Sequence, residues 1–274
     1  MTTETTIPPA GSAGPAGPRP DAGLRLSLRI LAVGFALLTV GWTAFTVASL
    51  LARVTDHRSA TYDGVRALDI DLGFESVEIV GAADATSVSM TRSYTWSLGK
   101  PSITNRLDGD LLSISSSCPF SVGLGCSGHV RLVVPRSMDV QVHNSDGSVT
   151  LRDLNGPVDL STSDGSITAA NLTGRVTLHS SDGSLVATGL RSEQVDASTS
   201  DGSVRLSFEL APSSVTAHSG DGSIEVVVPA DGTAYHVTGT TGDGSRDVTV
   251  PTDSNSARRM RLSTGDGSVR VLAR

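Results

Sequence analysis

A four-residue motif recurs seven times in the second half of the chain, and its spacing limits the possible folds more than any other feature. Four copies read Ser-Asp-Gly-Ser and three read Gly-Asp-Gly-Ser, with 18 to 23 residues between successive aspartates. Repetition at such a period is typical of stacked repeat architectures. The aspartates and glycines of the motif are Asp146 and Gly147, Asp164 and Gly165, Asp182 and Gly183, Asp201 and Gly202, Asp221 and Gly222, Asp243 and Gly244, and Asp266 and Gly267.

The residues around each motif alternate between apolar and polar. In the second copy Val158 and Leu160 precede the aspartate, and Ile167 and Ala169 follow it, each pair at a spacing of two. Nearly every copy repeats this pattern, and the residue two before the aspartate is always small and polar. A period of two indicates strands with one buried face, so each copy is predicted to be strand, Asp-Gly turn, strand. The turn glycine is expected to supply a positive φ.

Two all-β arrangements fit this pattern: a β-solenoid, in which equivalent strands stack, or a sandwich built from hairpins. Gly239 and Arg246 break the apolar columns, and both belong to the sixth copy. Because similar residues otherwise recur at each column, we expect a β-helix-like solenoid over residues 137–274, whose copies bury their apolar faces on one another. Residues 65–136 carry weaker strand patterns and are predicted to form an N-terminal cap, since terminal repeats are usually atypical.

An uncharged apolar run at residues 30–52 precedes the predicted β region. As a helix it would measure about 35 Å, which exceeds the roughly 30 Å hydrocarbon core of a bilayer. A buried helix and a cleaved signal peptide are the alternatives, but signal cores are shorter, at about 7–15 residues. We therefore predict one transmembrane helix, a disordered cytoplasmic tail at residues 1–29, a linker at 53–64 and an extracytoplasmic domain beyond.

The two cysteines, Cys118 and Cys126, lie in a glycine-rich loop of the predicted cap. Outside the cytoplasm a disulfide between them is expected, and closing this short loop would stabilise the fold by about 2–3 kcal/mol. Zinc would need further ligands, and only His129 is close in sequence. Three other histidines, His143, His179 and His218, precede alternate aspartates and are predicted to share a solvent-exposed face. Alternate rungs lie about 10 Å apart, which is too far for a shared metal.

The aspartate column raises the question of calcium. Carboxylates stacked about 5 Å apart would repel one another by about 1 kcal/mol even in water, and a cation would relieve this repulsion. The favoured interpretation is structural, with each aspartate accepting hydrogen bonds from turn amides and the flanking serines. Calcium is possible but not favoured, because period and acid count differ from the calcium-binding nonapeptide repeat.

Composition and missing motifs exclude several function classes. The net charge is −7, without a basic stripe, so nucleic acid is not an expected partner. The acids are themselves the repeat rather than a converging set, and no hydrolase, zinc-protease or phosphate-loop motif occurs. We therefore predict no cofactor and no enzymatic activity.

The recurrent unit V-x-L-x-T-S-D-G-S-V-x-L, the breaks at Val134-Pro135, Val228-Pro229 and Val250-Pro251, and the preceding apolar run together resemble a known group. Over residues 65–273 the chain is similar to the bacterial putative-adhesin family of β-strand-repeat domains, a domain of unknown function. The resemblance implies a solenoid-like fold and an envelope location. It implies neither a ligand nor catalytic residues.

The expected function is that of a membrane-anchored, extracytoplasmic structural or adhesin-like module that contacts a protein or glycan partner at the cell envelope. An accessory role in envelope-stress sensing or signalling is the alternative, and a polysaccharide-active β-helix enzyme is a weaker one. Partner identity and oligomeric state do not follow from the residues.

Overall fold

The computed structural model describes residues 22–51, 53–97, 99–118 and 126–274. The chain forms two compact units, Met1–Leu51 and Ala52–Arg274. Within the first, the structure describes one helix, α1 (Ala22–Leu51). The helix begins before the expected Ile30, so residues 22–29, which the sequence placed in the tail, are helical. Leucine and arginine dominate this stretch and favour a helix, and no proline interrupts it. Residues 1–21 of the predicted tail lie outside the described residues.

Helix α1 is apolar around its circumference. Its segment Arg29–Val47 has a mean hydropathy of 2.0, and none of it is buried within the protein. The hydroxyls of Thr39 and Thr43 each donate to the carbonyl three residues earlier, at 2.9 Å, so both are satisfied inside the helix. By length and composition, α1 is able to cross a membrane.

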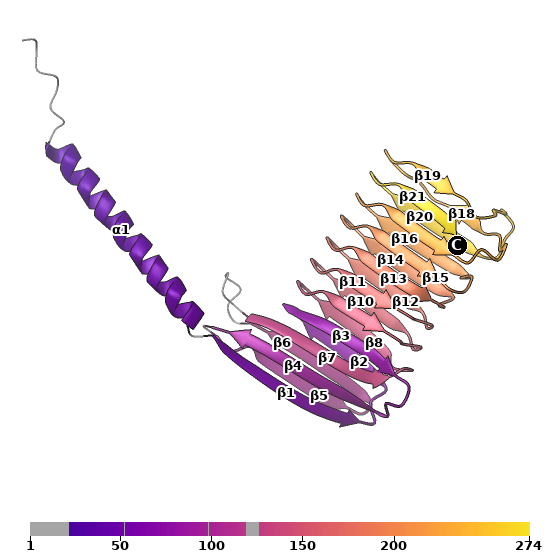
Figure 1. Ribbon diagram of the computed structural model, residues 1–274, viewed down its shortest axis with the longest axis horizontal. Helices are drawn as coiled ribbons and strands as arrows, with labels where there is room; N and C mark the ends of the chain where they lie inside the picture. Colours follow the sequence, from indigo (N-terminus) through magenta and orange to yellow (C-terminus); the bar gives the residue numbers. More distant parts are fainter. Residues whose placement is uncertain (1–21, 52, 98, 119–125) are drawn as a thin grey trace, which may run out of the picture. The chain divides into compact units, whose positions relative to one another are not determined.

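The second unit consists of two β-sheets that face each other across one apolar core (Figure 1). Sheet A contains, in spatial order, β1 (Val54–Asp63), β4 (Ser87–Trp96), β7 (Cys126–Pro135), β3 (Glu75–Ala82), β9 (Val149–Arg152), β11 (Ile167–Ala170), β13 (Leu185–Leu190), β15 (Val204–Phe208), β17 (Ile224–Val228), β21 (Val269–Ala273) and β19 (Arg246–Val248). Sheet B contains β18 (His236–Thr238), β20 (Arg259–Thr264), β16 (Ser214–Ser219), β14 (Gln194–Thr199), β12 (Val176–Ser180), β10 (Val158–Thr162), β8 (Asp139–Asn144), β2 (Ala67–Leu72), β6 (Leu111–Ser117) and β5 (Ser102–Asp108).

Each repeat gives one strand to each sheet, and equivalent strands pair in parallel. Val158 of β10 pairs with Val140 on one side and Val176 on the other, so identical residues of successive repeats are neighbours. On sheet A, Ile167 pairs with Val149 and Leu185 in the same way. This arrangement confirms the predicted β-solenoid and rules out the sandwich of hairpins.

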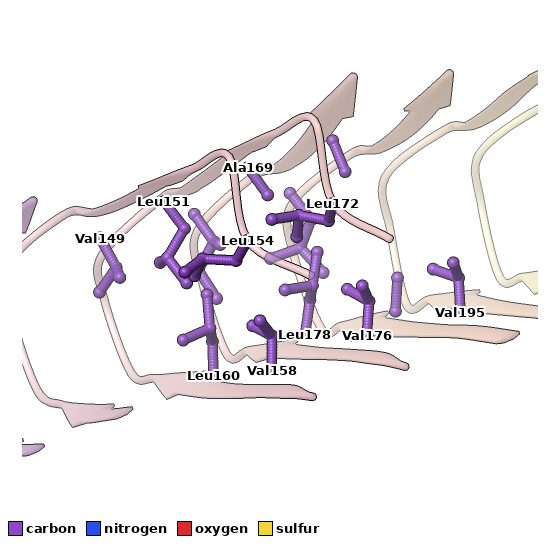
Figure 2. Packing of buried hydrophobic residues seen from close by; sticks show 14 of the residues in the cluster. Val149, Leu151, Leu154, Val158, Leu160, Ala169, Leu172, Val176, Leu178 and Val195 are labelled. Atoms are coloured by element: carbon purple, nitrogen blue, oxygen red, sulfur yellow. The ribbon is translucent and has the colours of Figure 1, made fainter. Parts of the chain in front are cut away.

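The core runs between the sheets as columns of aliphatic side chains (Figure 2). Val158 and Val176 point inward from sheet B, and Leu151 and Ala169 point inward from sheet A. Leu172 closes a corner of the coil, and all five side chains are buried. Equivalent aliphatic side chains of successive repeats therefore stack on one another and provide the close packing that a protein core requires.

The last two repeats are stacked in the reverse of their chain order. Strands β20 and β21 of the seventh repeat pair with β16 and β17 of the fifth, and the sixth repeat, β18 and β19, lies outermost. This order explains why the exceptions fall in the sixth copy. Arg246 is exposed on the terminal rung, where its guanidinium donates to the Val237 carbonyl at 2.9 Å, and Gly239 has φ +146°.

The N-terminal region is more regular than the cap we expected. Strands β2 and β3 pair in parallel with β8 and β9, and β6 and β7 add a further parallel rung. Beyond that rung, β4 and β1 in sheet A and β5 in sheet B run antiparallel. The expected linker at residues 53–64 contains β1, whose Ala60 and Tyr62 pack partly against the core. A single core cluster joins this region to the repeats, so the two do not form separate domains.

Candidate interaction surfaces

The seven Asp-Gly turns lie in one column along an edge of the solenoid. The Asp164 amide donates to the Ser145 carbonyl and the Asp182 amide to the Ser163 carbonyl, both at 2.9 Å, so each turn hydrogen-bonds to its neighbour. All seven aspartates are exposed, and the structure brings every predicted turn residue into this column. The edge therefore presents a carboxylate at each rung.

The turn glycines have a different role from the one expected. None of the seven has a positive φ. Instead, a Cβ on Gly183 would lie 2.0 Å from the carbonyl oxygen of Gly165, and a Cβ on Gly202 would lie 2.0 Å from that of Gly183. Glycine is required because the backbone of the neighbouring rung occupies the space that a side chain would fill.

A column of small polar side chains, two residues before each aspartate and buried in every copy except the sixth, secures the turns. The Ser180 hydroxyl accepts from the Gly183 amide at 2.9 Å and donates to the Gly165 carbonyl at 3.1 Å. Thr199 accepts from Gly202 and donates to the Gly183 carbonyl at 2.9 Å. The invariably small polar residue at this position signalled the role in the sequence, where the turn was expected to depend on aspartate. The hydroxyls of Thr162, Ser219 and Thr264 likewise accept a hydrogen bond from the amide of their turn glycine.

The expected hydrogen bonds of the aspartate carboxylates are therefore replaced by hydroxyl caps. Within the described ranges, the seven aspartate side chains make no hydrogen bond or ion pair with the protein. The same part of the chain contains no cluster of three or more histidine, cysteine or acidic residues able to hold a metal. Calcium binding by this edge stays a prediction that is possible but not favoured.

Cys118 and Cys126 are joined by a disulfide, with their Cα atoms 6.2 Å apart. Cys118 directly follows β6 and Cys126 begins β7. The bond therefore links the sheet B and sheet A strands of one rung, at the place where a turn connects the strands in the regular repeats. The loop at residues 119–125 lies outside the described residues.

Histidine and serine alternate along the outer face of sheet B. Register places His143, Ser161, His179 and Ser198 on successive strands, followed by His218. The His179 ring hydrogen-bonds the Ser198 hydroxyl at 2.9 Å. The shared face of the three histidines is as predicted, whereas the intervening serines did not stand out in a sequence that is rich in serine.

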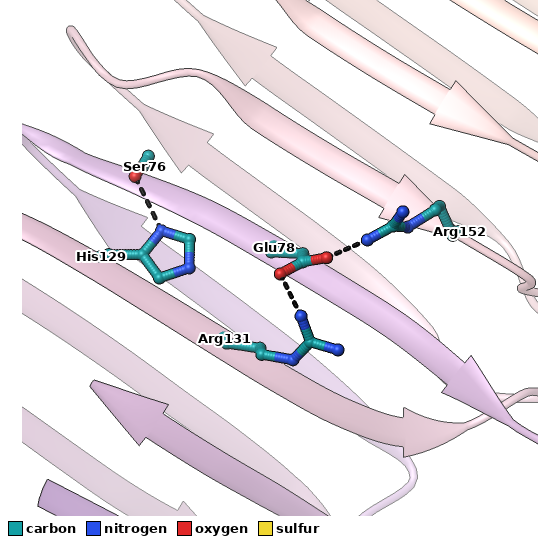
Figure 3. A network of polar contacts seen from close by, with 5 residues as sticks. All are labelled: Ser76, Glu78, His129, Arg131 and Arg152. Carbon is teal, nitrogen blue, oxygen red and sulfur yellow. Dashed lines mark hydrogen bonds and ion pairs between the residues drawn. The ribbon is translucent and has the colours of Figure 1, made fainter. Parts of the chain in front are cut away.

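The outer face of sheet A carries opposite charges that pair across strands (Figure 3). Glu78 lies between Arg131, at 2.5 Å, and Arg152. On later rungs, Arg205 pairs with Glu225 at 3.2 Å. Such exposed pairs contribute little stability, about 0–1 kcal/mol each, but they offset part of the charge on this face.

A corner of the solenoid forms a polar groove of about 300 Å³. Asp153 and Asn171 adopt left-handed φ values of 62° and 57°, and Gly189 follows them in the stack with φ 62°. The Asn171 amide donates to the Asp153 carboxylate at 2.9 Å. Arg136 and Arg191 also line the groove, which thus offers both signs of charge.

One carboxyl group is fully buried near the N-terminal end of the repeats. The Glu75 Oε2 atom accepts from the Phe74 amide at 3.1 Å, while within the described chain Oε1 and the buried Tyr94 hydroxyl lack a hydrogen-bond partner. Gly128 makes room for them, because a Cβ there would lie 2.6 Å from Glu75 Cγ. Burial, reinforced by the neighbouring Glu75 carboxylate, raises the pKa of Tyr94 well above its usual value.

This raised pKa predicts that the protein loses stability in alkali. Above pH about 10 the tyrosines of the unfolded chain ionise, whereas Tyr94 stays protonated in the fold, so the unfolded state binds fewer protons. The free energy of unfolding should then fall with rising pH, by up to about 1.4 kcal/mol per pH unit for this residue. Burial also raises the pKa of Tyr235, which adds to the fall. Urea titrations between pH 9 and 11 measure the slope; Tyr94→Phe should reduce it, and an unchanged slope would contradict the assignment.

The fold and its surfaces define a repeat β-solenoid whose polar groups run in columns. The family described as Toastrack DUF4097 matches residues 126–273, more than half of the chain. The chain belongs to the Toastrack DUF4097 family. This confirms the resemblance to a β-repeat family of unknown function, over a shorter range than residues 65–273.

Several solved structures are also similar to the chain. A putative adhesin from Parabacteroides distasonis is 13% identical, with a TM-score of 0.44, over 80% of this chain and 97% of that one. A putative adhesin from Bacteroides fragilis is 14% identical, with a TM-score of 0.42, over 80% and 97%. A putative lipid binding protein from Parabacteroides distasonis is 11% identical, with a TM-score of 0.44, over 79% and 96%. These likenesses are too distant to inform function, and no curated protein sequence matches significantly.

Proposed function

We propose that the protein is a membrane-anchored, extracytoplasmic interaction module that works as a structural, adhesin-like scaffold without catalytic activity. The observation that carries this proposal is the column arrangement of its surface groups. Asp164 and Asp182 recur at successive turns, and histidine and serine alternate from rung to rung on sheet B, as at His179 and Ser198. Repeated groups suit an extended partner that lies along the stack, whereas catalysis needs different groups that converge on one point.

Two features support the location. The apolar helix α1 is long enough to anchor the chain in a bilayer. The disulfide between Cys118 and Cys126 is the kind of bond that persists in oxidising compartments and is rare in the cytosol. Together they favour an N-terminus inside the cell and a β-solenoid outside it.

Thiol labelling of intact cells tests this orientation. A membrane-impermeant maleimide should label Cys118 and Cys126 only after reductant is added, and without permeabilisation. In a Cys118→Ser/Cys126→Ser chain that carries Ser12→Cys, labelling should instead require permeabilised cells. A native chain that is labelled only after permeabilisation would place the solenoid inside the cell and refute the proposed location.

The scaffold role has its own test. Cells that display the full chain should retain more soluble envelope polymer than cells that lack it. The purified full chain should release no new reducing ends from envelope polysaccharide. Release of sugar ends would show an enzyme, and equal retention by both cell types would contradict a role in adhesion.

A further inference from the structure

Three neighbouring strands at the C-terminal end of sheet B present cationic and hydroxyl side chains on their outer face. Register places Arg259 of β20 between Ser214 of β16 and His236 of β18. Arg261 lies in the same way between Thr216 and Thr238. We call these six residues the Arg259–Arg261 patch: Ser214, Thr216, His236, Thr238, Arg259 and Arg261.

The two arginines of the patch are available to a ligand. Both are exposed, and within the described residues their guanidinium groups make no hydrogen bond or ion pair. Several other arginines are occupied: Arg152 pairs with Glu78, and Arg258 donates to the Ala211 carbonyl at 2.6 Å. Arg259 and Arg261 differ from these in lying two residues apart on one strand face, in a chain whose net charge is −7.

No carboxylate neutralises the patch from its own strands. The outward residues of β16, β20 and β18 in the described structure are serine, threonine, histidine and arginine. The next acid along the register is Asp196 of β14, with Thr216 between it and Arg261. The reversed order of the last two rungs also matters, because it gives Arg261 a threonine on each side instead of leaving β20 at the edge.

We propose that the Arg259–Arg261 patch binds a linear anionic polymer whose charge is carried by phosphate groups, such as a sugar-phosphate or polyol-phosphate chain. Side chains two apart on one strand face lie about 7 Å from each other, so both guanidinium groups reach one extended chain. A planar carboxylate is satisfied by a single guanidinium fork. A tetrahedral phosphate also directs oxygens sideways, toward hydroxyls such as Thr216 and Thr238.

Nucleic acid fits the patch less well, although it also carries phosphates. Binding of single strands relies on aromatic side chains that stack on the bases, and the six patch residues include no such platform apart from the half-buried His236 ring. The inference rests on the proposed scaffold role in one respect: that role places the bound polymer in the cell envelope.

Binding of inorganic polyphosphate by the full chain, kept in solution with a non-ionic detergent, tests this inference. Arg259→Ser/Arg261→Ser should weaken binding by at least about tenfold and reduce the slope of log K against log salt by about two. The matched control is Arg131→Ser/Arg152→Ser, which removes the same charge from the ion-paired face of sheet A. It should change the affinity by less than about twofold, and melting curves show whether both variants fold.

Several results would overturn the inference: equal loss of affinity in both variants, no binding by the native chain, or tighter binding of hyaluronate, DNA or anionic vesicles than of polyphosphate. A dimer that the Arg259→Ser/Arg261→Ser change disrupts, without polyphosphate binding, would identify a second copy as the occupant instead. A negative result in the polyphosphate experiment does not affect the orientation measured by thiol labelling. The two proposals can therefore be refuted independently.

Discussion

Gly183→Ala is expected to lower the free energy of unfolding by about 3 kcal/mol or more, and to do so although the residue lies at a surface turn. The new Cβ would lie 2.0 Å from the Gly165 carbonyl oxygen, which is backbone and cannot move without opening the stack. Overpacking of this kind typically costs about 1–3 kcal/mol, and more where the backbone must shift. Urea denaturation of the two proteins measures the difference.

The matched control is the neighbouring substitution Asp182→Ala. Asp182 is exposed, and its carboxylate makes no hydrogen bond or ion pair with the described residues. We expect a change within about 0.5 kcal/mol, as for most surface substitutions. If Asp182→Ala were the more damaging change, the aspartate would hold the turn after all and the stacking role of glycine would be refuted.

Thr199→Val is the second change with a large expected effect. Valine keeps the shape but removes a buried hydroxyl that accepts from the Gly202 amide and donates to the Gly183 carbonyl. Leaving buried backbone groups without partners costs about 1–3 kcal/mol each, partly offset by hydroxyl removal, so we expect a net loss of about 2–4 kcal/mol. Thermal and urea unfolding both report it.

Thr177→Val provides the comparison for this prediction. Thr177 lies on the outer face of sheet B, and no hydrogen bond of its hydroxyl is seen among the described residues. The same change of side chain should alter the free energy of unfolding there by less than about 0.5 kcal/mol, since valine suits a strand. Equal losses at Thr177 and Thr199 would show that strand propensity, not the buried cap, decides the effect.

The architecture of the repeats was predictable because the residue type at each repeat position shows whether that position is buried or exposed. Val158, Val176 and their equivalents recur at one position, and a stack of parallel strands is the arrangement that places them on one another. The role of the turn residues was not predictable in the same way. A glycine required for its positive φ and a glycine required for lack of space look alike in sequence. Only the structure distinguishes the two roles, through the 2.0 Å between a Cβ added at Gly183 and the Gly165 carbonyl oxygen.

The order of the rungs was beyond sequence reasoning for a different reason. Periodicity shows that strands are equivalent but does not show which strands pair with one another in the sheet. A signal was present, because Leu262 and Val269 keep the apolar columns in the seventh repeat whereas Gly239 and Arg246 lose them in the sixth. A rung at the end of the stack has one neighbour fewer and tolerates these residues, so the exceptions mark the terminal position.

The surface sites were predictable only in part. The exposed face of His143, His179 and His218 followed from their common offset. The Arg259–Arg261 patch did not, because its residues come from three repeats and acquire a common surface through the reversed rung order.

Cysteine cross-linking tests most directly the claim that the repeats stack in parallel register with the seventh between the fifth and sixth. Thr216→Cys combined with Arg261→Cys places thiols on adjacent paired positions, about 5 Å apart and within the reach of a disulfide. Thr216→Cys combined with Thr238→Cys places them a rung further apart, at about 10 Å. Mild oxidation followed by peptide mapping should give the first cross-link and not the second. The reverse result would show that the rungs follow chain order and would contradict the account.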